Sequence, residues 1–413
     1  MKSWNEVAIP ASLFSFKFPS LQLTNSASGV KDSLPHKPLY RMYVCGITPY
    51  DATHLGHAAT YLTFDLINRY LRASGYEVRY VQNITDIDDP LLERANRDGI
   101  DWAQLAHQQI ELFRSDMVNL RVIPPTDYIG AVEAIRLVSA AIEQLSAKDS
   151  IYPVEQDLYF KVHADAGFGT RSHLSETEML KIFSERGGDP ARVGKKDPLD
   201  CLVWMAQRPN EPGWDSPFGI GRPGWHIECT AIAIKYLQPD SNEPSLIDIQ
   251  GGGSDLIFPH HEMCAAQAQV LTGKPLASTY VHAGMIGLDG EKMSKSKGNL
   301  VFVSKLLAAG TDPMAIRWAL MKSHYRTDRM WTDDLLVEAE TEIVALRSAL
   351  RSEKVAATSD LIEQIVECLA DDLDTSAVIA AINTWVAQSQ SEGDAGKAKD
   401  LETALDSLLG IKL

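Results

Sequence analysis

The chain has 413 residues, a formal net charge of −16 and an apolar fraction of 45%. This composition is typical of a globular enzyme with two or three domains. It excludes collagen-like, coiled-coil and low-complexity classes, and no run is apolar for the length of a membrane span. The acidic balance argues against binding of nucleic acid through a broadly basic surface. The 5 cysteines, without a secretory leader pattern, predict a cytoplasmic location where thiols stay reduced and can bind metal.

The first predicted elements bring two histidines to the start of a helix. After an N-terminal extension of residues 1–36, a buried strand at Tyr40–Cys45 runs through a turn-rich stretch into a helix near Gly56–Ala73. His54 and His57 lie at the N-terminus of that helix, where unpaired N–H groups and the positive end of the dipole stabilise a polyanion. Such a pair is by itself more often structural, but its chemistry suits a triphosphate.

The remaining strands of the predicted sheet lie in two separate parts of the chain. A second strand is expected at Glu77–Gln82, and later strands near Leu246–Gln250 and Tyr280–Met285, with helices between them. Strands that alternate with helices predict a parallel, doubly wound α/β sheet of the Rossmann-like kind. Residues 37–90 and 210–296 would then form one split nucleotide-binding domain, with its site at the carboxyl edge of the sheet.

Residues 91–209 are expected to form a connective insertion, with helices such as Ala131–Leu145 and one strand-like run at Asp157–Val162. Residues 297–413 are predicted to form a C-terminal helical bundle. With 12 basic and 19 acidic residues, this tail has a net charge of −7, which is poor material for binding tRNA. Its expected helices are Asp312–Ser323, Asp333–Leu350, Asp360–Ala370, Thr375–Gln390 and Lys397–Leu409.

A lysine loop follows the last predicted strand. Gly284–Gly290 leads into Lys-Met-Ser-Lys-Ser at 292–296, where Lys292 and Lys295 would be mobile cations that close over the charge developing at the α- and β-phosphates. Alone, such a segment is usually a solvated surface loop. Together with the upstream His-Leu-Gly-His, and in this order, it resembles the class I aminoacyl-tRNA synthetases. The resemblance implies activation of a carboxylate by ATP with Mg²⁺.

Cysteines and histidines in separate segments suggest a metal site. On spacing alone, an isolated cysteine on an apolar strand is more often a core residue. The segments from Cys45 to Ser296, however, resemble the cysteinyl branch of the synthetases, which implies one zinc ion held by Cys45, Cys229 and His260. Where that family has a glutamate four positions after the histidine, this chain has Cys264. Either Cys264 closes the site or, as we favour, zinc keeps an open position for the substrate thiolate.

The same resemblance implies the rest of the pocket. Trp225 would wall the cysteine site, Asp255 would orient the amino group of cysteine, and Ile286 would pack on adenine. The predicted catalytic residues are His54, His57, Lys292, Lys295 and Asp255. The predicted substrate- and adenylate-binding residues are Cys45, Gly46, Ile47, Thr48, Thr60, Asn83, Ile84, Thr85, Trp225, Gly253, Ser254, Asp255 and Ile286.

Two further segments, Gly46–His57 and Glu185–Pro190, resemble the ligases of mycothiol biosynthesis, which are relatives of cysteinyl-tRNA synthetase without its tRNA module. The resemblance implies transfer of activated L-cysteine to the amine of glucosaminyl-inositol (GlcN-Ins) by a monomer that needs neither tRNA nor membrane. By itself Glu185–Pro190 is typical of a solvated loop, and its role does not follow from the sequence. The alternatives are a cysteinyl-tRNA synthetase with a shortened C-terminus and a non-catalytic zinc- or nucleotide-binding paralogue.

Overall fold

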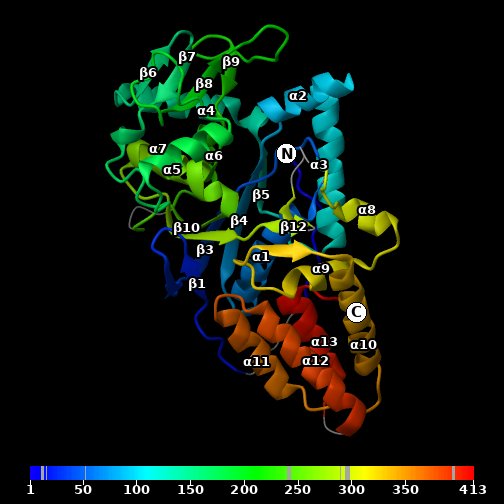
Figure 1. Cartoon of the computed structure of the whole chain (residues 1–413). Helices are drawn as coiled ribbons and strands as arrows, with labels where there is room; N and C mark the ends of the chain where they lie inside the picture. Colours follow the sequence, from blue (N-terminus) through cyan, green and yellow to red (C-terminus); the bar gives the residue numbers. More distant parts are fainter. Residues whose placement is uncertain are drawn as a thin grey trace.

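The computed structural model (Figure 1) describes the chain apart from residues 11–13, 15, 52, 240–242, 289, 294–297 and 393–395, and apart from the side chains of residues 291, 292 and 392. A central parallel sheet has helices on its two faces. A smaller antiparallel sheet lies at one end of the molecule and a group of helices at the other.

Within the described residues, the central sheet contains five parallel strands in the order β11, β10, β3, β4, β5. Their bounds are β3 Leu39–Val44, β4 Glu77–Ile84, β5 Asp127–Gly130, β10 Ile247–Gly253 and β11 Ala277–Ala283. This topology confirms the predicted parallel, doubly wound α/β fold. One strand, β5, lies inside residues 91–209, yet it pairs with β4. The sheet therefore extends into the range predicted as an insertion, through a strand too short to show a clear period.

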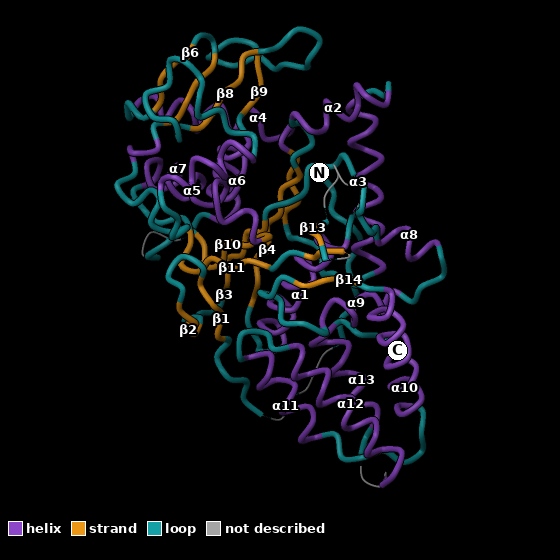
Figure 2. The backbone as a smooth tube through the Cα atoms, viewed as in Figure 1, coloured by secondary structure: helices purple, strands orange, loops and turns teal. Residues whose placement is uncertain are grey.

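Alternation along β3 explains how the sheet separates two cores. Tyr40, Met42 and Val44 belong to one hydrophobic cluster, whereas Tyr43 and the following Cys45 belong to the other. The first face is covered by α1 (Leu55–Ala73) and the second by α4 (Ala131–Ala147), α6 (Trp225–Leu237) and α7 (Glu262–Thr272). Figure 2 shows the central strands in orange between these groups of helices. Two further helices, α2 (Asp89–Asp98) and α3 (Trp102–Asn119), connect β4 to β5.

The smaller sheet is antiparallel, with strand order β6, β7, β8, β9. Its strands are β6 Ile151–Val154, β7 Asp157–Phe160, β8 Cys201–Ala206 and β9 Gly221–Pro223, and η1 (Val162–Ala164) and α5 (Glu176–Glu185) lie between β7 and β8. The sequence predicted only the run that contains β7. The others are short, and both β6 and β9 include a proline, which weakens a strand pattern. The division of the chain at residues 91 and 209 stays a proposal.

Short elements connect the sheet to the ends of the chain. An antiparallel hairpin of β1 (Gln22–Asn25) and β2 (Val30–Ser33) lies in the predicted N-terminal extension. Downstream, β12 (Ile286–Leu288) pairs with β13 (Glu291–Lys292) and, in parallel, with β14 (Arg329–Trp331). Between β10 and α7 the chain forms two short helical turns, η2 (Ser254–Leu256) and η3 (Ile257–His261).

The C-terminal region is helical, as predicted, and α10 has the predicted bounds. The elements are α8 Val303–Ala308, α9 Pro313–Met321, α10 Asp333–Leu350, α11 Ser359–Ala370, α12 Thr375–Glu392, α13 Ala398–Ala404 and η5 Leu405–Leu409. Apolar residues of these helices share one hydrophobic cluster with α1, so the helical region packs directly against the nucleotide-binding fold. Within the described part of the chain, no helix combines the length and apolar character needed to cross a membrane.

Candidate active site

The strand order reverses between β3 and β10, and a cavity of about 500 Å³ lies beyond the carboxyl ends of these two strands. Ligands of open parallel sheets bind at such a reversal, and the volume suits a small-molecule site. The cavity is lined by Cys45, Gly46, Ile47, Thr48, Tyr50, His54, Gly56, His57, Thr60, Tyr61, Trp225, Gly253, Asp255, Leu256, Gly284, Met285, Met293 and Leu300.

Most of the predicted site residues line this cavity, but several do not. Ser254 lines an adjoining cavity of about 320 Å³ that shares Asp255 and Met285 with the first. Ile286 is buried in the core, so its contact with adenine stays a prediction. Asn83, Ile84 and Thr85 are buried behind the cavity wall. Lys295 and the side chain of Lys292 lie outside the described residues.

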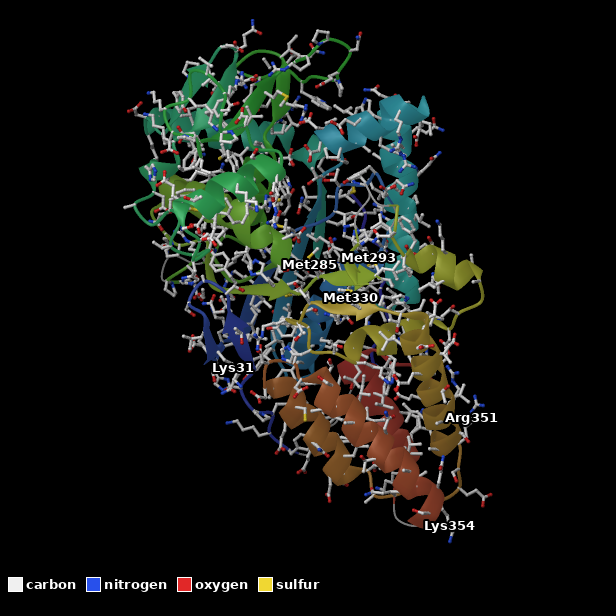
Figure 3. All side chains as sticks on the ribbon, in the orientation of Figure 1. Lys31, Met285, Met293, Met330, Arg351 and Lys354 are labelled. Atoms are coloured by element: carbon white, nitrogen blue, oxygen red, sulfur yellow. The ribbon has the colours of Figure 1, made fainter. Side chains whose placement is uncertain are left out.

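Residues that the sequence did not single out also line the cavity. Met293 stands between the two lysines of the loop, and Tyr50 lies in the turn-rich stretch before the histidines. Figure 3 shows Met285, Met293 and Met330 grouped at the centre of the molecule. Met293 could have been found from its place inside the lysine motif. The remaining additions are Gly56, Tyr61, Leu256, Gly284, Met285 and Leu300.

The two histidines form a compact pair at the start of α1. His54 is the N-cap, and its Nδ1 accepts a hydrogen bond from the backbone N–H of His57 at 3.3 Å. Their rings stack with centroids 3.6 Å apart. A Cβ on Gly56 would lie 2.9 Å from Cε1 of His54, so only glycine lets the ring fold over this turn. The imidazoles are thus held at the positive end of the α1 dipole, where they can contact phosphate.

The segment after the lysine loop is hydrogen-bonded to this histidine turn. The backbone N–H of Leu55 donates to the carbonyl of Val301 at 2.9 Å, and that of Val303 donates to the carbonyl of Thr53 at 3.0 Å. An isolated antiparallel bridge joins His54 to Phe302 between them. Residues 301–303, which follow the lysine loop, are therefore held against the histidine turn that lines the cavity.

Asn83 supports the cavity from behind. Its Oδ1 accepts hydrogen bonds from the backbone N–H of Gly46 at 2.8 Å and from the hydroxyl of Tyr43 at 3.1 Å. A Cβ on Gly46 would lie 1.7 Å from the carbonyl oxygen of Asn83, so the two strand ends approach closely only because residue 46 is glycine. Asn83 therefore holds the cavity-lining loop after β3 in place.

Cys45, Cys229 and His260 form a buried group whose ligand atoms all lie within 4.8 Å of one another. They come from the end of β3, from α6 and from η3 respectively. Burial disfavours charge on Cys229 and His260. Their pairing outweighs this effect: a hydrogen bond from Cys45 and the neighbouring His260 hold the pKa of Cys229 well below its usual value, and adjacent cysteines raise the pKa of His260 to about 10. Two sulfur donors and one imidazole are a ligand set that suits zinc.

Neighbouring side chains orient this group. The ring of Trp225 stacks on His260 with centroids 4.2 Å apart, and Nδ1 of His226 lies 2.9 Å from Nδ1 of His260. On the other side, Nε2 of His261 lies 3.3 Å from Sγ of Cys45. Cys45 and Trp225 both line the cavity, so the group lies at the cavity wall.

Cys264 lies one helical turn beyond His260 but outside the three-residue group. Its thiol donates to the carbonyl of His226 at 3.3 Å, and its Sγ is 3.8 Å from Nε2 of His260. The group whose ligand atoms all lie within 4.8 Å of one another does not include Cys264. This geometry supports a site with three protein ligands.

Asp116 on α3 is a buried carboxyl that interacts with Thr53, just before the histidine turn. From its burial we expect the stability of the protein to depend on pH. Burial raises the pKa of Asp116 to about 7, against a smaller lowering by a hydrogen bond with Thr53. Because an unfolded aspartate has a pKa of about 3.9, the folded chain binds the extra proton, and stability should fall as pH rises from about 4 to 7. We expect Asp116→Asn to come closest to the wild type below about pH 4, where Asp116 is protonated in both the folded and the unfolded chain, and to exceed it at pH 8.

Chemical denaturation of both proteins across this pH range would measure the effect. The exposed Asp215 provides the control, because Asp215→Asn should follow the wild-type profile at every pH. Parallel profiles for Asp116→Asn and the wild type would contradict the assignment.

Comparison with known proteins identifies the family. Residues 33–341 match the model of the class I (C) tRNA synthetase catalytic domain, a range that includes both motifs and the cysteine–histidine group. The chain belongs to the class I tRNA synthetase family. Among its solved relatives, methionyl-tRNA synthetase of Mycobacterium tuberculosis, in complex with methionyl-adenylate, aligns with a TM-score of 0.61 at 17% identity, over 90% of this chain and 88% of that one. This likeness shows a shared class I synthetase fold.

Curated relatives match the chain over its full length. An L-cysteine:1D-myo-inositol 2-amino-2-deoxy-alpha-D-glucopyranoside ligase of Kribbella flavida is 54% identical over 417 residues, which covers 100% of each chain. The protein of the same name in Nocardia farcinica is 51% identical over 420 residues, again with 100% of each chain covered. Both of these full-length relatives are named as ligases.

Proposed function

We propose that the chain is an ATP-dependent, AMP-forming ligase that activates L-cysteine and transfers it to the amine of GlcN-Ins, forming an amide in mycothiol biosynthesis. The observation that carries the proposal is the buried Cys45–Cys229–His260 group at the wall of a cavity that the histidine pair at the start of α1 also lines. A centre suited to a thiol thus lies beside one suited to a triphosphate. Full-length identity of 54% to a ligase of this name supports the amino-sugar acceptor.

In the first step, a carboxylate oxygen of cysteine attacks the α-phosphate of ATP. A bond from that oxygen to phosphorus forms, and the bond to the pyrophosphate oxygen breaks. His54 and His57 donate hydrogen bonds at the phosphates, and Lys292 and Lys295 close over the negative charge that develops there. Mg²⁺ supplied with ATP would add positive charge near the phosphates. No general base is needed, because the attacking carboxylate is already ionised.

Cys45, Cys229 and His260 would hold zinc, because all three are buried and their sulfur and nitrogen atoms lie close enough to share one ion. Zinc bound there would supply a soft Lewis-acid contact for the thiolate of the substrate. An apolar pocket alone separates near-isosteres such as cysteine and serine by only roughly 1–3 kcal/mol. The ligand set therefore accounts for selectivity, while Trp225 walls the pocket and Asp255 orients the amino group of cysteine.

In the second step, the neutral amine of the acceptor attacks the carbonyl carbon of the mixed anhydride. The new carbon–nitrogen bond replaces the bond to the phosphate oxygen, the nitrogen loses a proton, and AMP leaves. The acceptor is a small molecule, so the reaction needs neither tRNA nor membrane. We place the enzyme in the cytoplasm and propose that it acts as a monomer. The acidic helices after residue 297 fit this proposal better than the alternative of a shortened cysteinyl-tRNA synthetase.

Acceptor competition tests the proposal. The purified protein is incubated with labelled cysteine, ATP and Mg²⁺, and then with GlcN-Ins or total tRNA in parallel, while AMP release is counted. We expect label to pass to the amino sugar, with one AMP released per amide formed, and no label to pass to tRNA. Serine in place of cysteine serves as the control. Stable label on tRNA would return the chain to protein synthesis and refute the acceptor assignment.

A further inference from the structure

The segment Glu185–Pro190 forms a turn at the end of α5. Gly187 has φ +84°, a conformation that side chains disfavour, and a Cβ on Gly188 would lie 2.5 Å from the ring of Phe183. The carboxylate of Asp189 accepts from Nζ of Lys195 at 3.0 Å and from the hydroxyl of Tyr159. The glycines and the aspartate thus have structural roles, and these contacts fix the turn that carries Arg186.

Arg186 reaches from this turn to the segment that borders the substrate cavity. Its Nη1 donates to the backbone carbonyls of Asp255 and Phe258, which lie 69 and 72 residues further along the chain. These carbonyls belong to the η2–η3 segment between β10 and α7. The guanidinium therefore joins the region beside the small sheet to the loop at the carboxyl end of the central sheet.

The two carbonyls need an outside donor because the helical ladder is broken there. In a regular helix the carbonyl of Asp255 would accept from the N–H of residue 259, but that residue is proline and has no N–H. Phe258 has φ −141° and ψ 138°, which is extended and not helical. Arg186 supplies the missing donor at both carbonyls, and it does so with one nitrogen held by a fixed turn.

The segment held in this way carries two functional groups. Asp255 lines the cavity, and His260 belongs to the cysteine–histidine group. The far end of the segment is anchored independently: the buried carboxylate of Glu262 accepts from the backbone N–H groups of Gly169 and Ser172 at 3.0 and 2.8 Å. Arg186 is the corresponding anchor at the near end, where the chain leaves the sheet.

We propose that Arg186 is a positioning residue that sets the placement of Asp255 and His260 relative to the cavity. The inference rests on the proposed function only for its kinetic readout, because metal retention can be measured without turnover. Partners that orient a metal ligand typically contribute about 10- to 100-fold to metal affinity or activity. Arginine to lysine is not conservative at a site that bridges two acceptors, since an ammonium lacks the planar fork that fixes its donors.

The experiment compares Arg186→Met, Arg186→Lys and the control Lys181→Met, which removes an exposed cation from the same helix. Each full-length protein is dialysed against a zinc chelator, its remaining zinc is quantified, and ATP–pyrophosphate exchange is measured over a range of cysteine and of ATP. For Arg186→Met we expect faster zinc loss and a rise of about 10-fold or more in KM for cysteine. Arg186→Lys should fall between this variant and the wild type, and Lys181→Met should match the wild type.

Two results would overturn the inference. Wild-type zinc retention and wild-type KM for cysteine in Arg186→Met would show that the segment holds without Arg186. A rise confined to KM for ATP would show that Arg186 binds the nucleotide directly from the adjoining cavity, which it also lines. If Arg186→Met does not fold, the comparison of Arg186→Lys with Lys181→Met decides by the same readouts. Failure of the proposed function is distinct, since the wild type itself would then show no cysteine-dependent exchange.

Discussion

Replacement of Cys229 by serine is expected to eliminate metal retention and to lower cysteine-dependent ATP–pyrophosphate exchange by more than about 100-fold. Loss of a residue that only orients a metal ligand typically costs about 10- to 100-fold, and loss of a ligand itself should cost more. The hydroxyl of serine is not ionised near neutral pH, so it cannot take the place of the thiolate that the surroundings of Cys229 favour. Only Cys45 and His260 of the three close donors would then remain. Residual discrimination between cysteine and serine should fall to the roughly 10- to 200-fold that an apolar pocket gives.

Metal analysis by mass spectrometry and exchange assays with each amino acid would measure both effects. Two matched thiol variants serve as controls. Cys368→Ser alters a half-buried cysteine outside the group, and Cys264→Ser introduces a hydroxyl that can still donate to the carbonyl of His226. Both should retain zinc. Full zinc content in Cys229→Ser would mean that Cys229 is not a ligand, whereas zinc loss in Cys264→Ser would show that Cys264 closes the coordination sphere.

The spacing of apolar residues predicted the elements in which these residues recur with a clear helical or strand period. Helix α10 has the bounds Asp333–Leu350 that its apolar spacing indicates, and α1 begins within one residue of the expected position. The edge strand β5 has only four residues, and β6 and β9 contain proline, so the sequence carries little periodic signal there. These strands form because tertiary neighbours supply their hydrogen-bond partners, which no local window contains.

The site residues also differ in how far local sequence patterns could predict them. Cys45, Cys229 and His260 have no diagnostic spacing, and only a family resemblance brought them together before the structure placed their ligand atoms within 4.8 Å. The contribution of Arg186 could not be predicted, because its acceptors are backbone carbonyls 69 and 72 residues away. Every residue type has a backbone carbonyl, so the residues at the accepting positions do not indicate such a contact. It depends on the path of the main chain.

The second large effect is expected at Asp65, in the middle of α1. Its carboxylate is fully buried between two fully buried guanidinium groups: Nε of Arg69 donates to it at 2.7 Å, and Arg317 of α9 donates to the same oxygen. Its other oxygen accepts from the backbone N–H of Ile123 at 2.8 Å. Nε of Arg317 also donates a hydrogen bond to the backbone carbonyl of Leu409 at 2.6 Å. One carboxylate thus connects the helix that begins at the histidine pair to the C-terminal helices.

Substitution of Asp65 by alanine leaves two buried cations without a counter-charge, and we expect a loss of about 3–5 kcal/mol in the free energy of unfolding. Burial raises the pKa of Asp65, but the charges of Arg69 and then Arg317 hold it below its usual value. A lowered pKa means that the stabilisation is present above the unfolded value of about 3.9 and is lost as pH falls further. The difference between Asp65→Ala and the wild type should therefore be large at pH 7 and shrink below about pH 4.

Chemical denaturation at pH 7 and below about pH 4 tests this prediction. The control is Glu363→Ala, which removes an exposed carboxylate from α11. Equal stability of Asp65→Ala and Glu363→Ala at pH 7 would show that water or rearranged side chains solvate the arginines, and that α1 and the C-terminal helices are held by apolar packing alone.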